Sequence, residues 1–405
     1  MRSIRYHKYL PLAFIAFFVN GPAFFPTGLL VTSILSPLLY FWLLAKRRRF
    51  VLEMFLVAVF PFALANMIQG MKLRIFAPSF LLLLTVYVTT YAFAVAVQEM
   101  RNLHQLLRTL IWINLGLAIV GLGVRFTSVY SLMWSTPQDT TSKTIRFRGF
   151  SSEASLYSTL LLPLMLFSYW RFVRRRTRSN FFLLMATIIP LFMSLSYGVI
   201  GGIAIALTIV YLAGGKGLAR YKWVGLTLLV LVAGYVALPK TNPIRKRAID
   251  MLTGTDSSEY LRTTASYIAG YREAKSRDLW FGIGLGETKD VGLSYITWSR
   301  QSGSTHFPCV IAETLGELGI VGLAFRFFLE FYFFFRTKTY SDPYRLSLFI
   351  AIFMIQFGGS FKDNLAEYMV WILAFSRSAG VSSEPEPVLA KTETEPYLQT
   401  APQLI

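Results

Sequence analysis

Two arginines separated by one residue precede an apolar stretch that is long enough to form a helix. The segment reads RFRGFSSE and contains Arg146 and Arg148, with Glu153 at the start of the helix. A helix N-terminus with arginines beside it favours phosphate, because backbone N–H groups and guanidinium groups both attract negative charge. The structural alternative is that Ser151 or Ser152 caps the helix while Glu153 complements the helix dipole. That alternative leaves the two arginines without a role.

A second group of arginines lies in a basic segment further along the chain. Residues 258–276 have the pattern of an amphipathic helix, and one face of it contains Arg262, Ser266, Ala269 and Arg272. Such a face is either an ordinary solvated surface or a binding surface for an anion. The glycine run FGIGLG follows at 281–286. No strand–helix unit surrounds this run and its spacing differs from a dinucleotide fingerprint, so we expect a turn that allows close backbone approach.

A histidine begins the third candidate segment. His306 stands just before a late apolar stretch, at the predicted membrane edge. His7 and His104 fall on the other side of the membrane in the topology given below. A neutral imidazole accepts a proton from a sugar hydroxyl at pH 7, so His306 is a candidate general base. An interfacial polar residue without catalytic function is the alternative.

The sequence shows no pattern typical of a metal centre or of nucleophilic catalysis. Cys309 is the only cysteine, which excludes an internal disulfide and a multi-cysteine metal site. There is no P-loop, no nucleophilic triad and no His/Cys cluster. The predicted extracytoplasmic loops lack the paired acidic residues that would bind Mg²⁺ or Mn²⁺. We therefore expect any chemistry to proceed without a metal or a cofactor.

Long apolar segments place these candidates in an all-α polytopic membrane protein. The chain has 405 residues, of which 54% are hydrophobic, and blocks such as 79–97 and 109–124 carry no charge. A helix needs about 20 apolar residues to cross a hydrocarbon core of ~30 Å. About twelve transmembrane helices are predicted, at 9–25, 28–45, 50–69, 75–97, 109–127, 154–172, 181–196, 199–213, 223–239, 307–333, 345–360 and 364–377.

Basic runs in short loops set the predicted orientation. The runs at 46–49 (KRRR) and 171–178 (RFVRRRTR) are placed in the cytoplasm by the positive-inside rule. Both termini are then cytoplasmic. The predicted units are membrane helices one to nine within 1–239, including the periplasmic loop 128–153; a large basic periplasmic loop at 240–306; helices ten to twelve within 307–378; and a disordered cytoplasmic tail at 379–405.

The large loop is more basic than its position requires. The chain has a formal net charge of +19, and ten Lys and Arg residues lie within 240–305. Long loops escape the positive-inside rule, so this basicity is permitted there. One explanation is attraction to anionic lipid headgroups, which contributes about 1 kcal/mol per residue near the surface. The other is an anionic ligand such as a diphosphate, which arginine binds through two parallel hydrogen bonds.

In this order, the three segments resemble the bacterial O-antigen polymerase and O-antigen ligase superfamily, which includes exopolysaccharide polymerases. The resemblance covers 145–325: RFRGFSSEAS before a helix, Arg262 about twenty residues ahead of FGIGLG, and His306 ahead of AETLGELGIVGL. The segment 193–207 (MSLSYGVIGGIAIAL) resembles the family's hinge between two helices. The departures are Tyr197 in place of the usual Arg, Ala154 in place of Pro, Phe307 after the histidine, and a histidine two residues further upstream than usual.

The resemblance implies a GT-C-like fold and an inverting glycosyl transfer at the periplasmic face of the bacterial inner membrane. The donor would be a glycan on undecaprenyl diphosphate. Arg148 and Arg262 would hold the diphosphate leaving group, with support from Arg146 and Arg272. His306 would be the base for the acceptor hydroxyl, and Glu153 would orient the acceptor or an arginine.

Three functions remain open at this point. The first is a polymerase that joins lipid-linked repeat units, and the second is a ligase that moves the glycan onto lipid A–core or another acceptor. The departures around the histidine lean against the ligase. The third is a transporter or flippase, although transporters concentrate functional charges inside helices and this chain concentrates them in a loop. Expected partners are the undecaprenyl-diphosphate-linked glycan, membrane lipids and a chain-length regulator protein, without nucleic acid.

Overall fold

A computed structural model shows an almost entirely helical chain. The residues that it describes are 6–19, 31–48, 50–70, 72–100, 102–135, 145–151, 153–213, 260–289, 307–359 and 364–380, together with Ile249, Thr253 and Lys362. Strands occur among them only in one hairpin, β1 (Trp134–Ser135) and β2 (Arg146–Phe147). These two strands are antiparallel, with Trp134 opposite Phe147.

The apolar segments form helices where the sequence predicts them, with shifted ends. Eleven of the twelve predicted segments coincide with helices, and the remaining one, 223–239, lies outside the described residues. The apolar helices are α1 (Leu10–Phe14, continued by the π-helical turn η2, Ile15–Val19), α2 (Val31–Ala45), α3 (Val51–Ile68), α4 (Leu73–Glu99), α5 (Leu103–Val124), α6 (Ala154–Arg174), α7 (Arg178–Ser194), α8 (Tyr197–Ala213), α14 (Val310–Arg336), α15 (Pro343–Gly358) and α16 (Leu365–Phe375).

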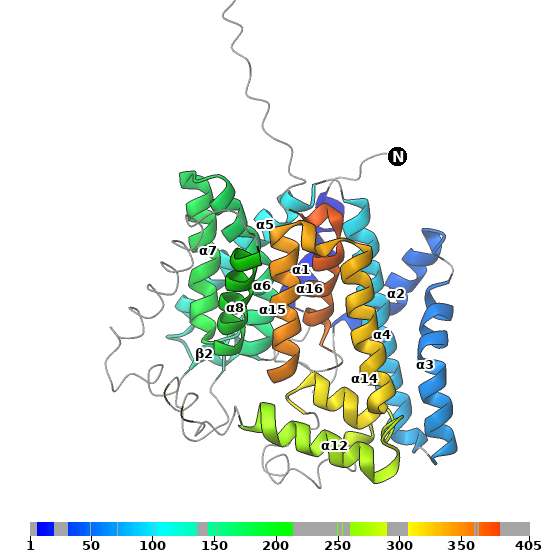
Figure 1. Cartoon of the computed structure of the whole chain (residues 1–405). Coiled ribbons are helices and arrows are strands. Elements are labelled where there is room, and N and C mark those ends of the chain that lie inside the picture. Colours follow the sequence, from blue (N-terminus) through cyan, green and yellow to red (C-terminus); the bar gives the residue numbers. More distant parts are fainter. Residues whose placement is uncertain are drawn as a thin grey trace, which may run out of the picture.

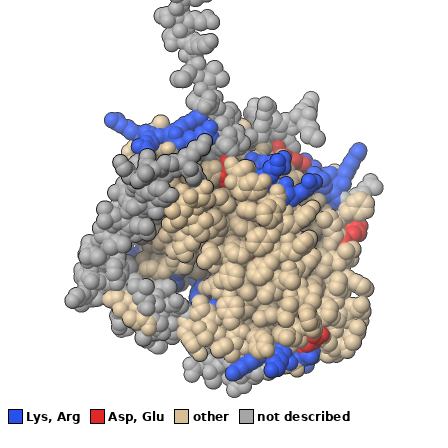
Figure 2. All heavy atoms as spheres, in the orientation of Figure 1, with Lys and Arg blue, Asp and Glu red and all other residues tan. Residues whose placement is uncertain are grey.

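Length and composition make this an all-α membrane protein. Among the described helices, α3, α4, α5, α6 and α14 are long and apolar enough to cross a membrane, and the other apolar helices are shorter. Figure 1 shows these helices standing side by side in a bundle, and Figure 2 shows a broad surface of uncharged residues with Lys and Arg side chains at its upper and lower margins. Large apolar residues remain exposed on α3, as expected for a surface that faces lipid.

The remaining described elements are short, and most of those that concern the candidate site lie at one end of the bundle. At that end, which is the lower one in Figure 1, lie the β1–β2 hairpin and α12 (Ser266–Arg277). The sequence predicts this end to be extracytoplasmic. The other short elements are η1 (Tyr6–Lys8), η3 (Tyr130–Leu132), η4 (Leu261–Ala265), η5 (Glu287–Lys289), η7 (Thr339–Ser341) and η8 (Arg377–Ala379).

A kink divides α14 into a part that lies across the lower end of the bundle and a part that runs along the bundle. Gly319 has φ +66° and ψ −166°, which is not helical, so residues 310–318 and 320–336 point in different directions. The first part lies beside α12, which crosses the end of the bundle, and the second part runs along the bundle (Figure 1). A positive φ of this kind favours glycine, because other residues would be strained.

The glycine run at 281–286 packs backbone to backbone against this kink. The N–H groups of Ile283 and Gly284 donate to the carbonyls of Gly316 and Glu317, at 2.9 and 3.0 Å. The N–H groups of Ile320 and Val321 donate in return to the carbonyls of Leu279 and Trp280, both at 3.0 Å. Gly282, Gly284 and Gly286 all have positive φ. The predicted close backbone approach is therefore confirmed.

We expect Gly282→Ala and Gly319→Ala each to lower the free energy of unfolding by about 1–3 kcal/mol. Both glycines have positive φ, and a Cβ at either would overlap backbone atoms, those of Glu317 for Gly282 and those of Trp280 for Gly319. Denaturant or thermal unfolding of the detergent-solubilised protein measures the effect. The matched control is Gly123→Ala, since nothing lies within 4 Å of a Cβ there and the residue is inside a helix. Equal stability of all three variants would contradict the packing described here.

Candidate functional site

The first arginine pair flanks Phe147: Arg146 lies in strand β2, and Arg148 directly follows the strand with its backbone N–H bonded to the Met133 carbonyl. Phe147, between them, is buried and packs edge-to-face on Trp134 and Tyr157, each with ring centroids 5.2 Å away. Because side chains alternate along a strand, burial of Phe147 directs Arg146 and Arg148 to the opposite face. The apolar anchor thus fixes the orientation of both cations.

Backbone carbonyls hold these two guanidinium groups. Arg146 Nε donates to the carbonyl of Ser194, the last residue of α7, at 3.0 Å. Arg148 Nη2 donates to the carbonyl of Ser131 at 2.5 Å, and its backbone N–H donates to Met133 at 2.9 Å. Partial burial lowers the pKa of Arg148, but a guanidinium stays charged at neutral pH. The pair is a fixed, cationic surface feature of the hairpin.

A further arginine, which the sequence did not single out, stands beside this pair. The Arg125 guanidinium lies 5.0 Å from the ring centroid of Trp134, over the ring that packs against Phe147. Trp134 itself is fixed by a hydrogen bond of 2.7 Å from its indole N–H to the carbonyl of Gly121. Arg125 and Trp134 are nine residues apart in an irregular segment, so no periodic pattern in the sequence predicts that they stack.

Glu153 occupies the N-cap position of α6 and is exposed. Its carboxylate accepts a hydrogen bond of 2.8 Å from Ser155 and does not cap the helix. The predicted cap by Ser151 is wrong, because the helix begins at Ala154 and Ser151 is buried two positions before its N-cap. Ser152 lies outside the described residues. Glu153 is thus available at the same end of the bundle as the arginine pair.

The two arginines of the second group, Arg262 and Arg272, do not share a face. Arg262 lies in η4, where its Nη1 is 3.6 Å from the position that a Cβ on Gly359 would take, so it reaches the end of α15. Ser266 and Ala269 are buried, whereas Arg272 is exposed on another side of α12. Each step of three residues falls about 60° short of a full helical turn, so Arg272 lies about 120° around α12 from Ser266 and outside its buried face. The π-helical turn η4 changes the register only of Arg262, ahead of α12.

The structure holds Arg146 in β2 and Arg148 just after it, and it places Arg262 elsewhere at the same end of the bundle, near the end of α15 (Figure 1). The predicted base, His306, lies outside the described residues. Its neighbour Phe307 is buried and packs in an apolar cluster with Ala269 of α12.

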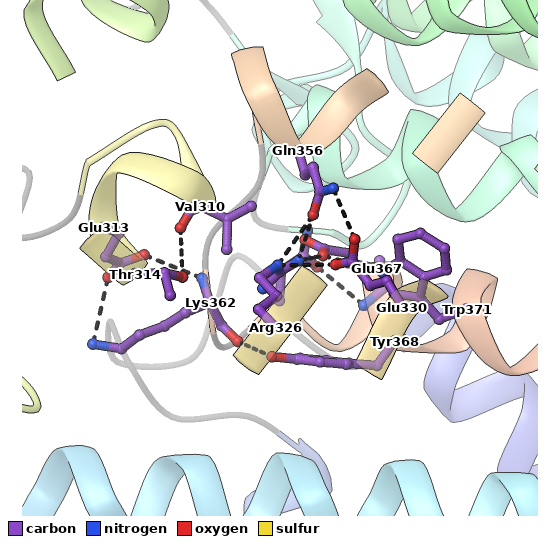
Figure 3. Close-up of polar contacts among 12 residues, drawn as sticks. Val310, Glu313, Thr314, Arg326, Glu330, Gln356, Lys362, Glu367, Tyr368 and Trp371 are labelled. Atoms are coloured by element: carbon purple, nitrogen blue, oxygen red, sulfur yellow. Dashed lines mark hydrogen bonds and ion pairs between the residues drawn. The ribbon is translucent and has the colours of Figure 1, made fainter. Parts of the chain in front are cut away.

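A buried lysine and two buried carboxylates lie on the side of α12 that faces the bundle. Glu313 and Glu317 stand one turn apart on α14, and Lys362 comes from the connection between α15 and α16. The Lys362 ammonium forms an ion pair with Glu317. It also lies 3.6 Å from Glu313, whose carboxylate accepts the Lys362 backbone N–H at 3.1 Å (Figure 3). This group, Glu313–Glu317–Lys362, ties the α15–α16 connection to α14.

A second polar group continues from the first toward the middle of the bundle. The two groups are linked by the Tyr368 hydroxyl, which donates to the Lys362 carbonyl at 2.5 Å (Figure 3). The centre of the second group is Arg326 of α14. Arg326 forms ion pairs with Glu330, at 3.1 Å, and with Glu367. Gln356 of α15 accepts two hydrogen bonds from Arg326, at 3.0 and 3.1 Å, and donates one to Glu330 at 3.1 Å. Charged residues inside membrane helices pair in this way because hydrocarbon cannot solvate them.

One more carboxylate joins the first group from α12. Glu273 is fully buried, and Thr288 donates to its Oε2 at 3.1 Å. Burial and the nearby charge of Glu317 raise the pKa of Glu273 to about 9. Sequence reasoning passed over Glu273 and Lys362. The available signal for Glu273 was its position on a stripe of small residues, where a long acidic side chain is unusual.

The site therefore combines fixed guanidinium groups near the surface with paired charges that are buried deeper in the bundle. Among the described residues, no group of three or more His, Cys, Asp or Glu side chains is arranged to hold a metal ion. No protein-family model matches the chain, and no curated protein is found to match it.

Replacing Lys362 by methionine should lower the free energy of unfolding by about 3–5 kcal/mol, since it leaves two carboxylates buried without their cation. Adding Glu313→Gln and Glu317→Gln to Lys362→Met should restore most of that loss. Unfolding of the purified variants in detergent gives the comparison, with Lys275→Met as control because Lys275 is exposed on α12. If Lys362→Met were as stable as its control, the buried ion pair would have no structural importance.

Proposed function

We propose that this protein polymerises oligosaccharide repeat units carried on undecaprenyl diphosphate, by a metal-independent, inverting glycosyl transfer at the periplasmic face of the inner membrane. The observation that carries the proposal is the position of Arg146, Arg148 and Arg262 at one end of an apolar helical bundle. A lipid-borne diphosphate lies at headgroup level, which is the level that such an end occupies. The resemblance to polymerases and ligases supports the same reaction.

The reaction needs positive charge more than it needs a nucleophilic side chain. The acceptor hydroxyl oxygen bonds to the anomeric carbon as the anomeric C–O bond to the diphosphate breaks. The electron pair leaves with undecaprenyl diphosphate, and the hydroxyl proton passes to a base, for which His306 is the candidate. Guanidinium groups that are already fixed in place stabilise the developing charge without reorganising. Arg146 and Arg148 are fixed in this sense by backbone carbonyls.

Arg148→Ala and Arg262→Ala should each reduce polymer formation by at least about a hundredfold, the usual loss when a donor to a developing anion is removed. Arg→Lys at either position should also impair the reaction, because an ammonium cannot form the two parallel bonds of a guanidinium. Polymer is measured in cells that lack the chromosomal copy, with membrane levels of each variant verified. Lys275→Ala, an exposed cation on α12, is the matched control. Normal polymer from both alanine variants would refute the diphosphate-binding role.

Deletion of the gene should distinguish the polymerase from its alternatives. We expect single repeat units on undecaprenyl diphosphate to accumulate, because the donor is made and translocated but not extended. The lipid-linked glycans are extracted and sized by mass spectrometry. Long chains that stay on undecaprenyl diphosphate would indicate a ligase instead, and repeat units that stay on the cytoplasmic face would indicate a flippase.

A further inference from the structure

Helix α12 docks on α14 through a stripe of small residues that contains one ionisable side chain. The buried positions have the i, i+3, i+4, i+7, i+8 spacing of one helix face. Gly270 lies so close to the Ala312 carbonyl that a Cβ there would overlap it, and the Glu273 carboxylate lies directly over Gly316. The stripe consists of Ser266, Ala269, Gly270, Glu273 and Ala274.

The groups around Glu273 do not provide a cation of its own. From α14 it faces Glu313 and Glu317, and from the α15–α16 connection it faces Lys362, which is already paired with those two carboxylates. From η5, Thr288 donates to Oε2, while Oε1 has no hydrogen-bond partner among the described residues. The cations of α12 itself, Arg272, Lys275 and Arg277, are exposed.

An ionised Glu273 would therefore be a third negative charge beside one buried ammonium. A buried charge without a partner is far more costly than a buried neutral carboxylic acid. We propose that Glu273 is a positioning residue that docks α12 on α14 only as the neutral acid, so that docking takes up one proton from the extracytoplasmic solution. Because η4 directly precedes α12, docking also sets the position of Arg262. The position of Arg262 matters for diphosphate binding only if the proposed function is correct, whereas the docking itself does not depend on that function.

The direction of the pH dependence follows from the two protonation states. The pKa of Glu273 is about 9 when α12 is docked, and an exposed glutamate has a pKa near 4.5. Between these values the undocked helix has lost the proton that the docked helix keeps. The docking equilibrium constant should therefore fall about tenfold for each pH unit across this range, and it should be independent of pH outside it.

The only cysteine of the chain is a built-in reporter of docking. Cys309 is fully buried in the cluster between α12 and α14, where Ala269 packs with it and Tyr267 of α12 contacts its thiol. The thiol donates to carbonyls of α15 on its other side, so we expect a neutral maleimide to reach it when α12 moves away. The labelling rate thus equals the opening equilibrium constant multiplied by the intrinsic thiol rate.

The test compares labelling of the wild-type protein and of Glu273→Gln, in detergent, from pH 5.5 to pH 8.5. At each pH the intrinsic thiol rate cancels in the ratio of the two rates. Glutamine keeps the shape and the acceptor for Thr288 but cannot ionise, so the ratio should rise about a hundredfold between pH 6 and pH 8. Lys275→Ala should follow the wild-type profile.

A ratio that does not change with pH would overturn the proposal. If Glu273→Gln fails to fold, dividing the wild-type rate by that of the unfolded chain at the same pH gives the slope directly, and a slope of zero has the same meaning. Labelling is measured without any glycan. A flat profile would therefore refute proton-linked docking and leave the glycosyl transfer untouched, while intact polymer in the arginine variants would do the reverse.

Discussion

Contact between the backbone of residues 279–286 and the kink of α14 determines the geometry of the end of the bundle that α12 crosses. Four backbone hydrogen bonds join residues 279–284 to residues 316–321, and positive φ values at Gly282, Gly284, Gly286 and Gly319 make them possible. Nothing bulkier than a hydrogen at Gly282 or Gly319 fits between the two backbones. Because α12 directly precedes the run and residues 310–318 directly precede the kink, this contact sets where α12 lies, and with it where Arg262 lies.

Charge is distributed over this end in two layers of opposite character. Arginines at the hairpin and on η4 remain partly exposed, where the proposed diphosphate would compete with water for them. Where α12 packs on the bundle, three carboxylates and one lysine are buried, and their interaction is strong because the surrounding dielectric constant is low. The buried layer holds helices in place, and the partly exposed arginines meet the substrate in the proposed reaction. A change in one layer should therefore alter the other only through helix position.

Features that depend on local sequence were predictable, and features that depend on distant pairing were not. Apolar blocks located eleven helices among the described residues, and the spacing of glycines at 282, 284 and 286 indicated close backbone approach. Lys362 was not singled out, because its partners Glu313 and Glu317 are some fifty residues away in sequence and no pattern links them. Arg272 was grouped with Arg262 by ideal helical spacing, which the π-helical turn η4 breaks. The predicted helix at 223–239 and His306 lie outside the described residues and stay predictions.

The interlocked glycines have an evolutionary consequence. Gly270 and Gly282 each face the backbone of residues 310–318, while Gly316 and Gly319 face the segment that runs from α12 to the glycine run. A larger residue on either side requires a compensating shift on the other, and single substitutions cannot supply it. Residues 266–286 and 310–322 should therefore be inherited as one block, and recombination between divergent chains that separates them should yield proteins that fail to assemble.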